Sequence, residues 1–141
     1  FKKPIVGSDS WGSAETVKLC GKDCYGLFFS THYAAAGAKG ATKKFIDRYN
    51  KKYGYVPDDV AALTWDAMYI VQKAIQSCGK ITGDIKKDRQ CVRDAMAKIK
   101  DFEGITGKMT FPEGQGDPIK CAVIVRISDK GEFEFYKSVC P

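Results

Sequence analysis

The sequence predicts an α/β fold: an open sheet with flanking helices that ends in a C-terminal β-hairpin. Short apolar runs bounded by glycine or polar residues alternate with stretches of helical periodicity up to about residue 99. After residue 104, only strand and turn signals remain. The 141 residues suffice for one domain with a core, and the 44% hydrophobic content excludes a disordered chain.

The first elements are two strands around a short helix. Residues 4–7 form an apolar run that predicts a short buried strand ending at Gly7. Ser13 is a good N-cap for a helix over residues 14–19, which Gly21 ends. Residues 25–30 are aromatic and apolar on both faces, which predicts a central strand. A loop rich in glycine and alanine follows, from residue 34 to 40.

Three helices are predicted next. One covers residues 41–53, and Gly54 ends it. Asp58 can cap a longer helix over residues 58–78, and a third helix lies near residues 87–99. Apolar positions nearly encircle the long helix, which predicts that it is buried between other elements. These positions are Val60, Leu63, Ala67, Met68, Ile70, Val71, Ala74 and Ile75.

The last third of the chain reads as β-structure. Residues 104–111 predict a short strand, and the glycine-rich residues 114–118 predict a loop. Two further strands, 121–127 and 132–137, are separated by a turn signal at 128–131. This pattern predicts an antiparallel hairpin.

Charge and motifs exclude several function classes. The net charge of +6 comes from 23 basic and 17 acidic residues, and no block of five like charges occurs. The basic residues fall on expected helix faces, which favours solvated surfaces over a nucleic-acid interface. No apolar run is long enough to span a membrane. The chain also lacks a Gly-x-Ser-x-Gly sequence, a P-loop and a dinucleotide-binding fingerprint, so we expect no enzyme activity and no cofactor.

Six cysteines are many for this length, and they fall into pairs of neighbours along the chain. Six thiols allow 15 pairings, but each neighbouring pair brackets a turn or short loop that can bring its sulfurs together. We therefore predict disulfides and an oxidising compartment. A zinc site is disfavoured because there is no Cys-x-x-Cys and His32 is the only histidine. The predicted pairs are Cys20 with Cys24, Cys78 with Cys91, and Cys121 with Cys140.

Several segments, taken in order, resemble a known family. No single one is diagnostic, but their order and spacing resemble the type I periplasmic binding proteins, in particular the branched-chain amino-acid receptors of ABC transporters. The segments are Gly7-Ser8-Asp9-Ser10-Trp11, Phe29-Ser30-Thr31-His32-Tyr33, Tyr49-Asn50-Lys51-Lys52-Tyr53-Gly54, Ala61-Ala62-Leu63-Thr64-Trp65-Asp66-Ala67, Phe102-Glu103-Gly104-Ile105-Thr106-Gly107 and Gly116-Asp117-Pro118-Ile119-Lys120.

The resemblance implies a two-lobed fold of which residues 1–141 form a single C-terminal portion. Residues 1–30 and 119–141 resemble one lobe, and residues 34–111 resemble the other. The implied function is non-catalytic, extracytoplasmic binding of an amino acid or related small molecule, which is passed to an ABC permease. The implied location is periplasmic or extracellular. A ligand-sensing domain of the same fold, coupled to a signalling partner, is the alternative.

The resemblance also implies ligand-binding residues after the first strand. Asp9 corresponds to the acid that meets the α-ammonium group of an amino acid, and an ammonium taken from water needs such a partner. Asp9 can instead tighten the strand-to-helix turn through its own backbone. Ser8 and Trp11 are expected to line the same mouth, although Trp11 can equally pack on the helix.

Tyr33 and Trp65 complete the expected ligand set. Tyr33 lies where the chain leaves the crossing strand and can stack on a ligand or bond to it, whereas the adjacent His32 is expected to be structural. Trp65 can line the cleft or pack in the core. We also expect the isolated chain to form a homodimer, because strand 25–30 and helix 58–78 are covered in the family by segments that precede Phe1.

Overall fold

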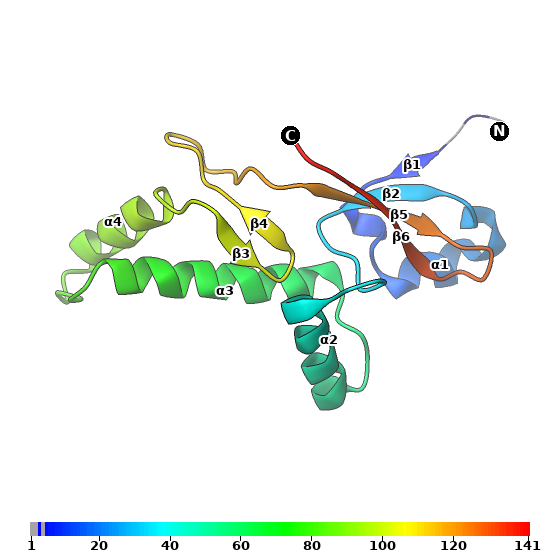
Figure 1. The fold of residues 1–141 in the computed structure, drawn as a ribbon, viewed down its shortest axis with the longest axis horizontal. Helices are drawn as coiled ribbons and strands as arrows, with labels where there is room; N and C mark the ends of the chain where they lie inside the picture. The colour runs from blue at the N-terminus through cyan, green and yellow to red at the C-terminus, as the bar shows by residue number, and fades with distance from the viewer. Residues whose placement is uncertain (1–2, 4) are drawn as a thin grey trace.

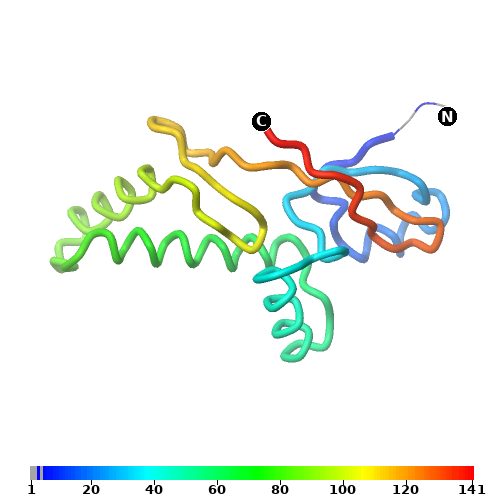
Figure 2. The backbone as a smooth tube through the Cα atoms, in the orientation of Figure 1, coloured from blue at the N-terminus to red at the C-terminus, as the bar shows by residue number. Residues whose placement is uncertain are grey.

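The computed structural model describes Lys3 and residues 5–141, so Pro4, the first residue of the strand expected at 4–7, lies outside the described residues. The molecule is elongated and consists of two groups of elements (Figure 1). At one end, a four-stranded sheet packs with helix α1. At the other, helices α2, α3 and α4 lie with a small two-stranded hairpin. The tube view shows the chain crossing between the groups after β2 and again before β5 (Figure 2).

The sheet has the strand order β1-β2-β5-β6. β1 (Val6–Gly7) is parallel to β2 (Phe28–Thr31), and β5 (Ala122–Ile127) and β6 (Phe133–Val139) follow in antiparallel pairing. The open sheet, the central place of β2 and the C-terminal hairpin are confirmed. The prediction of a buried first strand is wrong, since Val6 is 69% exposed. The reason is that β1 is an edge strand, with no described strand on its outer side.

The core of the sheet group lies between the sheet and α1 (Ala14–Cys20). Phe29, Val125 and Ile127 are its buried strand residues, and Val17 of α1 packs against them. Helix α1 begins as predicted, because the Ser13 side chain accepts a hydrogen bond from the Glu15 backbone N–H. A short 3-10 helix follows at Gly21–Cys24, and a turn at residues 25–26 moves the start of the strand expected at 25–30 to Phe28.

The other group contains the three remaining helices. They are α2 (Gly40–Tyr53), α3 (Asp59–Ser77) and α4 (Ile85–Met96), within a few residues of the predicted bounds. Gly54 ends α2 in the left-handed conformation at φ 82°, and Asp58 caps α3 by accepting from the Ala61 backbone N–H at 2.9 Å. Among the described residues, none of the helices combines the length and the apolar composition of a membrane span.

Helix α3 is not buried all round, so that prediction is wrong. Its buried residues, Ala62, Asp66, Ile70 and Ala74, form a single row. A second row carries no charge and is exposed or half-buried; we call it the α3 stripe. It consists of Val60, Ala67, Met68, Val71 and Ile75. Val60 and Met68 are each 65% exposed. The apolar pattern of α3 therefore predicted more buried side chains than the described chain provides.

The strand expected at 104–111 is instead a two-stranded hairpin of β3 (Phe102–Gly104) and β4 (Gly107–Met109). Its turn is fixed by Asp66 of α3, which accepts hydrogen bonds from the backbone N–H groups of Ile105 and Thr106 at 2.8 and 2.9 Å. Gly104 allows this approach, because a Cβ there would overlap the Asp66 carboxylate. The hydrogen bonds to Asp66 therefore stabilise a turn within the segment that was expected to form a single strand.

The three predicted disulfides are present, and no described cysteine is free. Cys20–Cys24 closes the 3-10 turn after α1, and Cys78–Cys91 ties the end of α3 to α4. Cys121–Cys140 ties the start of β5 to the end of β6. Two bonds therefore stabilise the sheet group and one stabilises the helical group.

Candidate functional site

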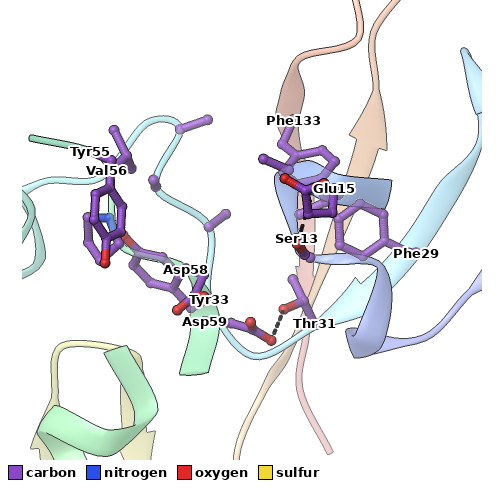
Figure 3. Close-up of a pocket in the computed structure, with 17 residues that line it drawn as sticks. Ser13, Glu15, Phe29, Thr31, Tyr33, Tyr55, Val56, Asp58, Asp59 and Phe133 are labelled. Carbon is purple, nitrogen blue, oxygen red and sulfur yellow. Dashed lines mark hydrogen bonds between the residues drawn. The ribbon is translucent and has the colours of Figure 1, made fainter. Parts of the chain in front are cut away.

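A cavity of about 450 Å³ lies where the sheet group meets the start of α3 (Figure 3). One wall comes from the sheet and the first turn of α1. The opposite wall comes from the chain that leaves β2 and from the turn that begins α3. The lining residues used below are Ser13, Glu15, Phe29, Thr31, Tyr33, Asp58, Asp59 and Phe133.

Two polar residues connect these walls. The Thr31 hydroxyl, at the end of β2, lies 3.4 Å from Asp59 Oδ2 in a hydrogen bond that Figure 3 draws as a dashed line. Gly12, just before α1, lies beside Asp59, since a Cβ at this position would be in van der Waals contact with the Asp59 carboxylate at 3.5 Å. The start of α3 is thereby held against the carboxyl end of β2, where ligands bind in open α/β sheets.

Tyr33 is a buried polar residue of the cavity wall. Its ring packs with Phe45, Ile46 and Ala62 of the helical group, and only 7% of the residue is exposed. The hydroxyl oxygen is buried and has no hydrogen-bond partner. Burial raises the pKa of the Tyr33 phenol to about 12, and the negative charge of Asp58 adds to the effect. The phenol therefore stays protonated at neutral pH.

Asp9 lies outside the lining of this cavity, at the carboxyl end of β1 in the 3-10 turn Asp9–Trp11. Its Oδ1 accepts from the Ser10 backbone N–H at 3.0 Å, and its Oδ2 lies 3.8 Å from His32 Nε2. The local turn contact expected as its alternative role is present. The side chain is 57% exposed, and its ligand role stays a prediction.

Ser8, Trp11 and Trp65 also lie outside the cavity lining. The Ser8 hydroxyl lies 3.2 Å from that of Ser10 on the surface. Trp11 packs on the sheet core, where a Cβ at Gly7 would overlap its ring. Trp65 lines a separate groove between α2 and α3, where its ring is tilted against that of Phe45 with the centroids 5.1 Å apart. Of the five predicted ligand residues, only Tyr33 lines the cavity.

The carboxylates of the cavity were not predicted as ligand residues. Glu15 and Asp59 lie in the first turns of α1 and α3, and Asp58 was predicted only as a cap. The sequence signal that could have indicated these carboxylates is that two helices begin with an acidic residue in the first turn. The sequence did not show that both helix starts face one cavity, because this depends on how the groups pack.

A second set of polar contacts joins the crossing segments. Lys120 Nζ donates hydrogen bonds to the carbonyl oxygens of His32, at 3.1 Å, and Thr106. Thr106 in turn donates to Asp66 through its backbone N–H and its hydroxyl. Desolvation lowers the pKa of the Lys120 ammonium group, while nearby Asp66 opposes the shift. One lysine thus fastens both crossing segments to the β3–β4 turn.

A sequence profile for a family described as periplasmic binding protein matches residues 2–132. The chain belongs to the periplasmic binding protein family. Among curated proteins, none matches the chain. The family match agrees with the placement of the cavity at the junction of two groups of elements.

Solved structures of this family share the fold of the chain. The leucine-binding protein LivK of Thermotoga maritima is 28% identical over 100% of this chain, with a TM-score of 0.85. LivJ of Streptococcus pneumoniae, solved with isoleucine, is 27% identical over 99% of the chain, with a TM-score of 0.80. An extracellular ligand-binding receptor from Rhodopseudomonas palustris is 27% identical over 96%, with a TM-score of 0.74. The chain spans 38%, 38% and 41% of their respective lengths.

Proposed function

We propose that this chain is part of an extracytoplasmic solute-binding protein that delivers an amino acid or related small molecule to an ABC permease. The observation that carries the proposal is the cavity at the junction of the two groups, in a chain of the periplasmic binding protein family. Binding proteins of this kind perform no chemistry, so the cavity needs only to recognise and release its solute.

The two groups of elements correspond to two lobes in this proposal. The sheet group draws on residues 1–30 and 119–141, and the helical group on residues 34–111. The separation of the sheet from helices α2, α3 and α4 supports this division (Figure 2). The hydrogen bonds of Lys120 to His32 and Thr106, which join the two crossing segments, support it as well. A solute held between lobes is recognised only when both lobes contribute contacts, which couples binding to closure.

Asp9 is the residue that we propose for the ammonium group of the solute. An exposed carboxylate at the carboxyl end of β1 fits this role, and the Ser10 backbone N–H holds it in place. Ser8 precedes it in the chain, and Tyr33 lines the cavity. The contact between an ammonium and a carboxylate is charge-assisted and is stronger than a neutral hydrogen bond.

Calorimetric titration of the complete two-lobed protein with a panel of amino acids tests this function. Asp9→Ala should weaken binding of the preferred amino acid at least tenfold, or about 1.4 kcal/mol. Asp47→Ala is the matched control, since this exposed acid on α2 pairs with Lys43 at the surface. Unchanged affinity in Asp9→Ala would remove Asp9 from the site, and the absence of binding by any solute would refute the function.

The isolated 141-residue chain should bind free amino acids weakly or not at all. The resemblance assigns the groups that hold the ligand carboxylate to another part of the protein, and one ammonium contact does not offset the cost of immobilising a ligand. Micromolar binding by the isolated chain would contradict this expectation.

A further inference from the structure

The net charge of the protein is concentrated in one segment of the helical group. Of the total charge of +6, residues 79–100 contribute +4, from seven lysine and arginine residues and three aspartates. All seven basic side chains are exposed. The α3–α4 connection and the start of α4 lie at the end of the molecule farthest from the sheet group (Figure 1).

The three aspartates of this segment are engaged within it. Asp88 accepts hydrogen bonds from the backbone N–H groups of Thr82 and Gly83, both at 2.9 Å. Asp84 caps α4, and Asp94 pairs with the arginine before it in the chain. Two of the seven cations pair with these aspartates. The other five form no salt bridge in the part of the chain that the structure describes: Lys80, Lys86, Arg89, Lys98 and Lys100.

Two exposed isoleucines lie among these cations. Ile81 is 48% exposed and Ile85 is 66% exposed. They flank the turn whose backbone bonds to Asp88, and the Cys78–Cys91 disulfide ties the start of the same connection to α4. On α4, spacings of four and three residues place Arg89 beside Ile85 and Lys86. Cationic and apolar side chains are thus presented together on a backbone that is already fixed. We call this surface the tip patch; it consists of Lys80, Ile81, Ile85, Lys86 and Arg89.

The composition of this segment favours a lipid partner over a protein. Residues 79–100 include no aromatic residue, and five of their seven cations are lysines. Protein interfaces are enriched in aromatic residues and arginine and depleted in lysine. Clustered lysines beside exposed apolar side chains are instead typical of surfaces that lie on anionic membranes. There the cations are attracted to the lipid phosphates and the apolar groups enter the headgroup layer.

We propose that the tip patch docks the protein on the surface of an anionic phospholipid membrane. The inference rests on the proposed function only for the location of the protein, at the outer face of the membrane that holds the permease. The cavity lies at the start of α3 and the patch follows its end, so the 19 residues of this helix separate them. A helix of this length spans about 28 Å, so docking through the patch leaves the cavity open to solutes.

The experiment is co-sedimentation of the complete two-lobed protein with vesicles of two compositions. One contains equal parts of phosphatidylglycerol and phosphatidylcholine, and the other contains phosphatidylcholine alone. We expect at least tenfold stronger binding to the anionic vesicles, and high salt should remove the difference by screening. The double variant Lys86→Glu and Arg89→Glu should also remove it. Both side chains are exposed and glutamate is a good helix former, so this variant folds.

The matched control is the double variant Lys44→Glu and Lys130→Glu. These two lysines are exposed and lie outside the tip patch, and their replacement changes the net charge by the same amount. The control should therefore keep its preference for anionic vesicles. Equal binding of the unchanged protein to both kinds of vesicle, or equal losses in the two double variants, would overturn the inference.

Ile85→Ser separates a lipid surface from other polyanions. It should weaken vesicle binding severalfold, because the isoleucine enters the headgroup layer, and it should leave retention on poly-L-glutamate unchanged. Retention on poly-L-glutamate as strong as on the vesicles would overturn the inference and assign an acidic protein as the partner. Calorimetric titration with amino acids keeps the two proposals apart, since a protein that binds a solute but no vesicle overturns only the docking surface.

Discussion

The sheet group and the helical group use similar apolar content in different ways. In the sheet group, Phe29 and Ile127 are 1% and 0% exposed, because α1 and the strands enclose them. In the helical group, α3 buries one row of side chains and leaves the α3 stripe uncovered, with Met68 65% exposed. Both regions gave the same sequence signal, an apolar segment with few charges. The comparison teaches that such a pattern reports the contacts available to the complete fold, not those that one part of it makes.

The sharpest way to break this comparison is to truncate one side chain in each region. Phe29→Ala should lower the free energy of unfolding by about 3–5 kcal/mol, because it leaves a cavity in an enclosed core. Met68→Ala should change it by less than about 0.5 kcal/mol, because the side chain is already mostly in water. Urea unfolding of both variants at low protein concentration measures the difference. Equal losses would mean that the α3 stripe is covered after all.

The helical group contains a buried carboxylate that accepts hydrogen bonds from a turn. Asp66 is 2% exposed and accepts three hydrogen bonds from Ile105 and Thr106. Asp66→Ala should cost on the order of 3 kcal/mol, because buried donors lose a charged acceptor. Asp47→Ala, which removes an exposed pair with Lys43, should cost no more than about 0.5 kcal/mol. If both variants unfold at the same urea concentration, the Asp66 contact does not hold the β3–β4 turn.

The three disulfides close loops of different length, so their removal should lower the free energy of unfolding by different amounts. The bonds Cys121–Cys140 and Cys78–Cys91 span 19 and 13 residues, and each should contribute about 3 kcal/mol through loop-closure entropy. Cys20–Cys24 spans only 4 residues and should contribute about 2 kcal/mol. Paired Cys→Ser variants, compared by urea unfolding, test the order. Non-reducing peptide mapping that finds free thiols would instead refute the disulfides themselves.

The smallest expected effect concerns the uncovered side of the helical group. In the isolated chain, a second copy is the occupant that we expect on the α3 stripe, because contiguous exposed apolar surface without charge favours association. Sedimentation equilibrium at micromolar concentration should show a dimer, and Met68→Glu should weaken it at least tenfold. Gln76→Glu, on the same helix but outside the stripe, is the control. A single species of monomer mass for the unchanged chain would contradict the expectation.

Most of the fold was predictable because its signals are local. The caps Ser13 and Asp58 and the stop at Gly54 marked three helix ends, and the turn at 128–131 marked the hairpin. The two errors in the strands have non-local causes. β1 is exposed because its place is at an edge, and the strand expected at 104–111 is a hairpin because Asp66 bonds to its turn.

The candidate site was less predictable than the fold. The resemblance directed attention to Asp9 and its neighbours, and of that set only Tyr33 lines the cavity. Asp58 was identified from the sequence, but only for its effect on the helix that it caps. Its second role, as part of an acidic cavity wall, depends on residues 25 or more positions away and carries no signal in the local pattern.

The sequence by itself determined the α/β class, the helix ends, the neighbouring disulfide pairs and membership of the periplasmic binding protein family. These properties depend on backbone preferences, on short loops and on the order of motifs, all of which can be identified from neighbouring residues in the sequence. Only the tertiary structure decided which apolar faces are covered and which polar groups meet. The starts of α1 and α3 share a cavity with Tyr33, and Asp66 accepts hydrogen bonds from the β3–β4 turn. Packing brings these groups together, and contacts between residues far apart in the sequence produce no periodic pattern from which they could be predicted.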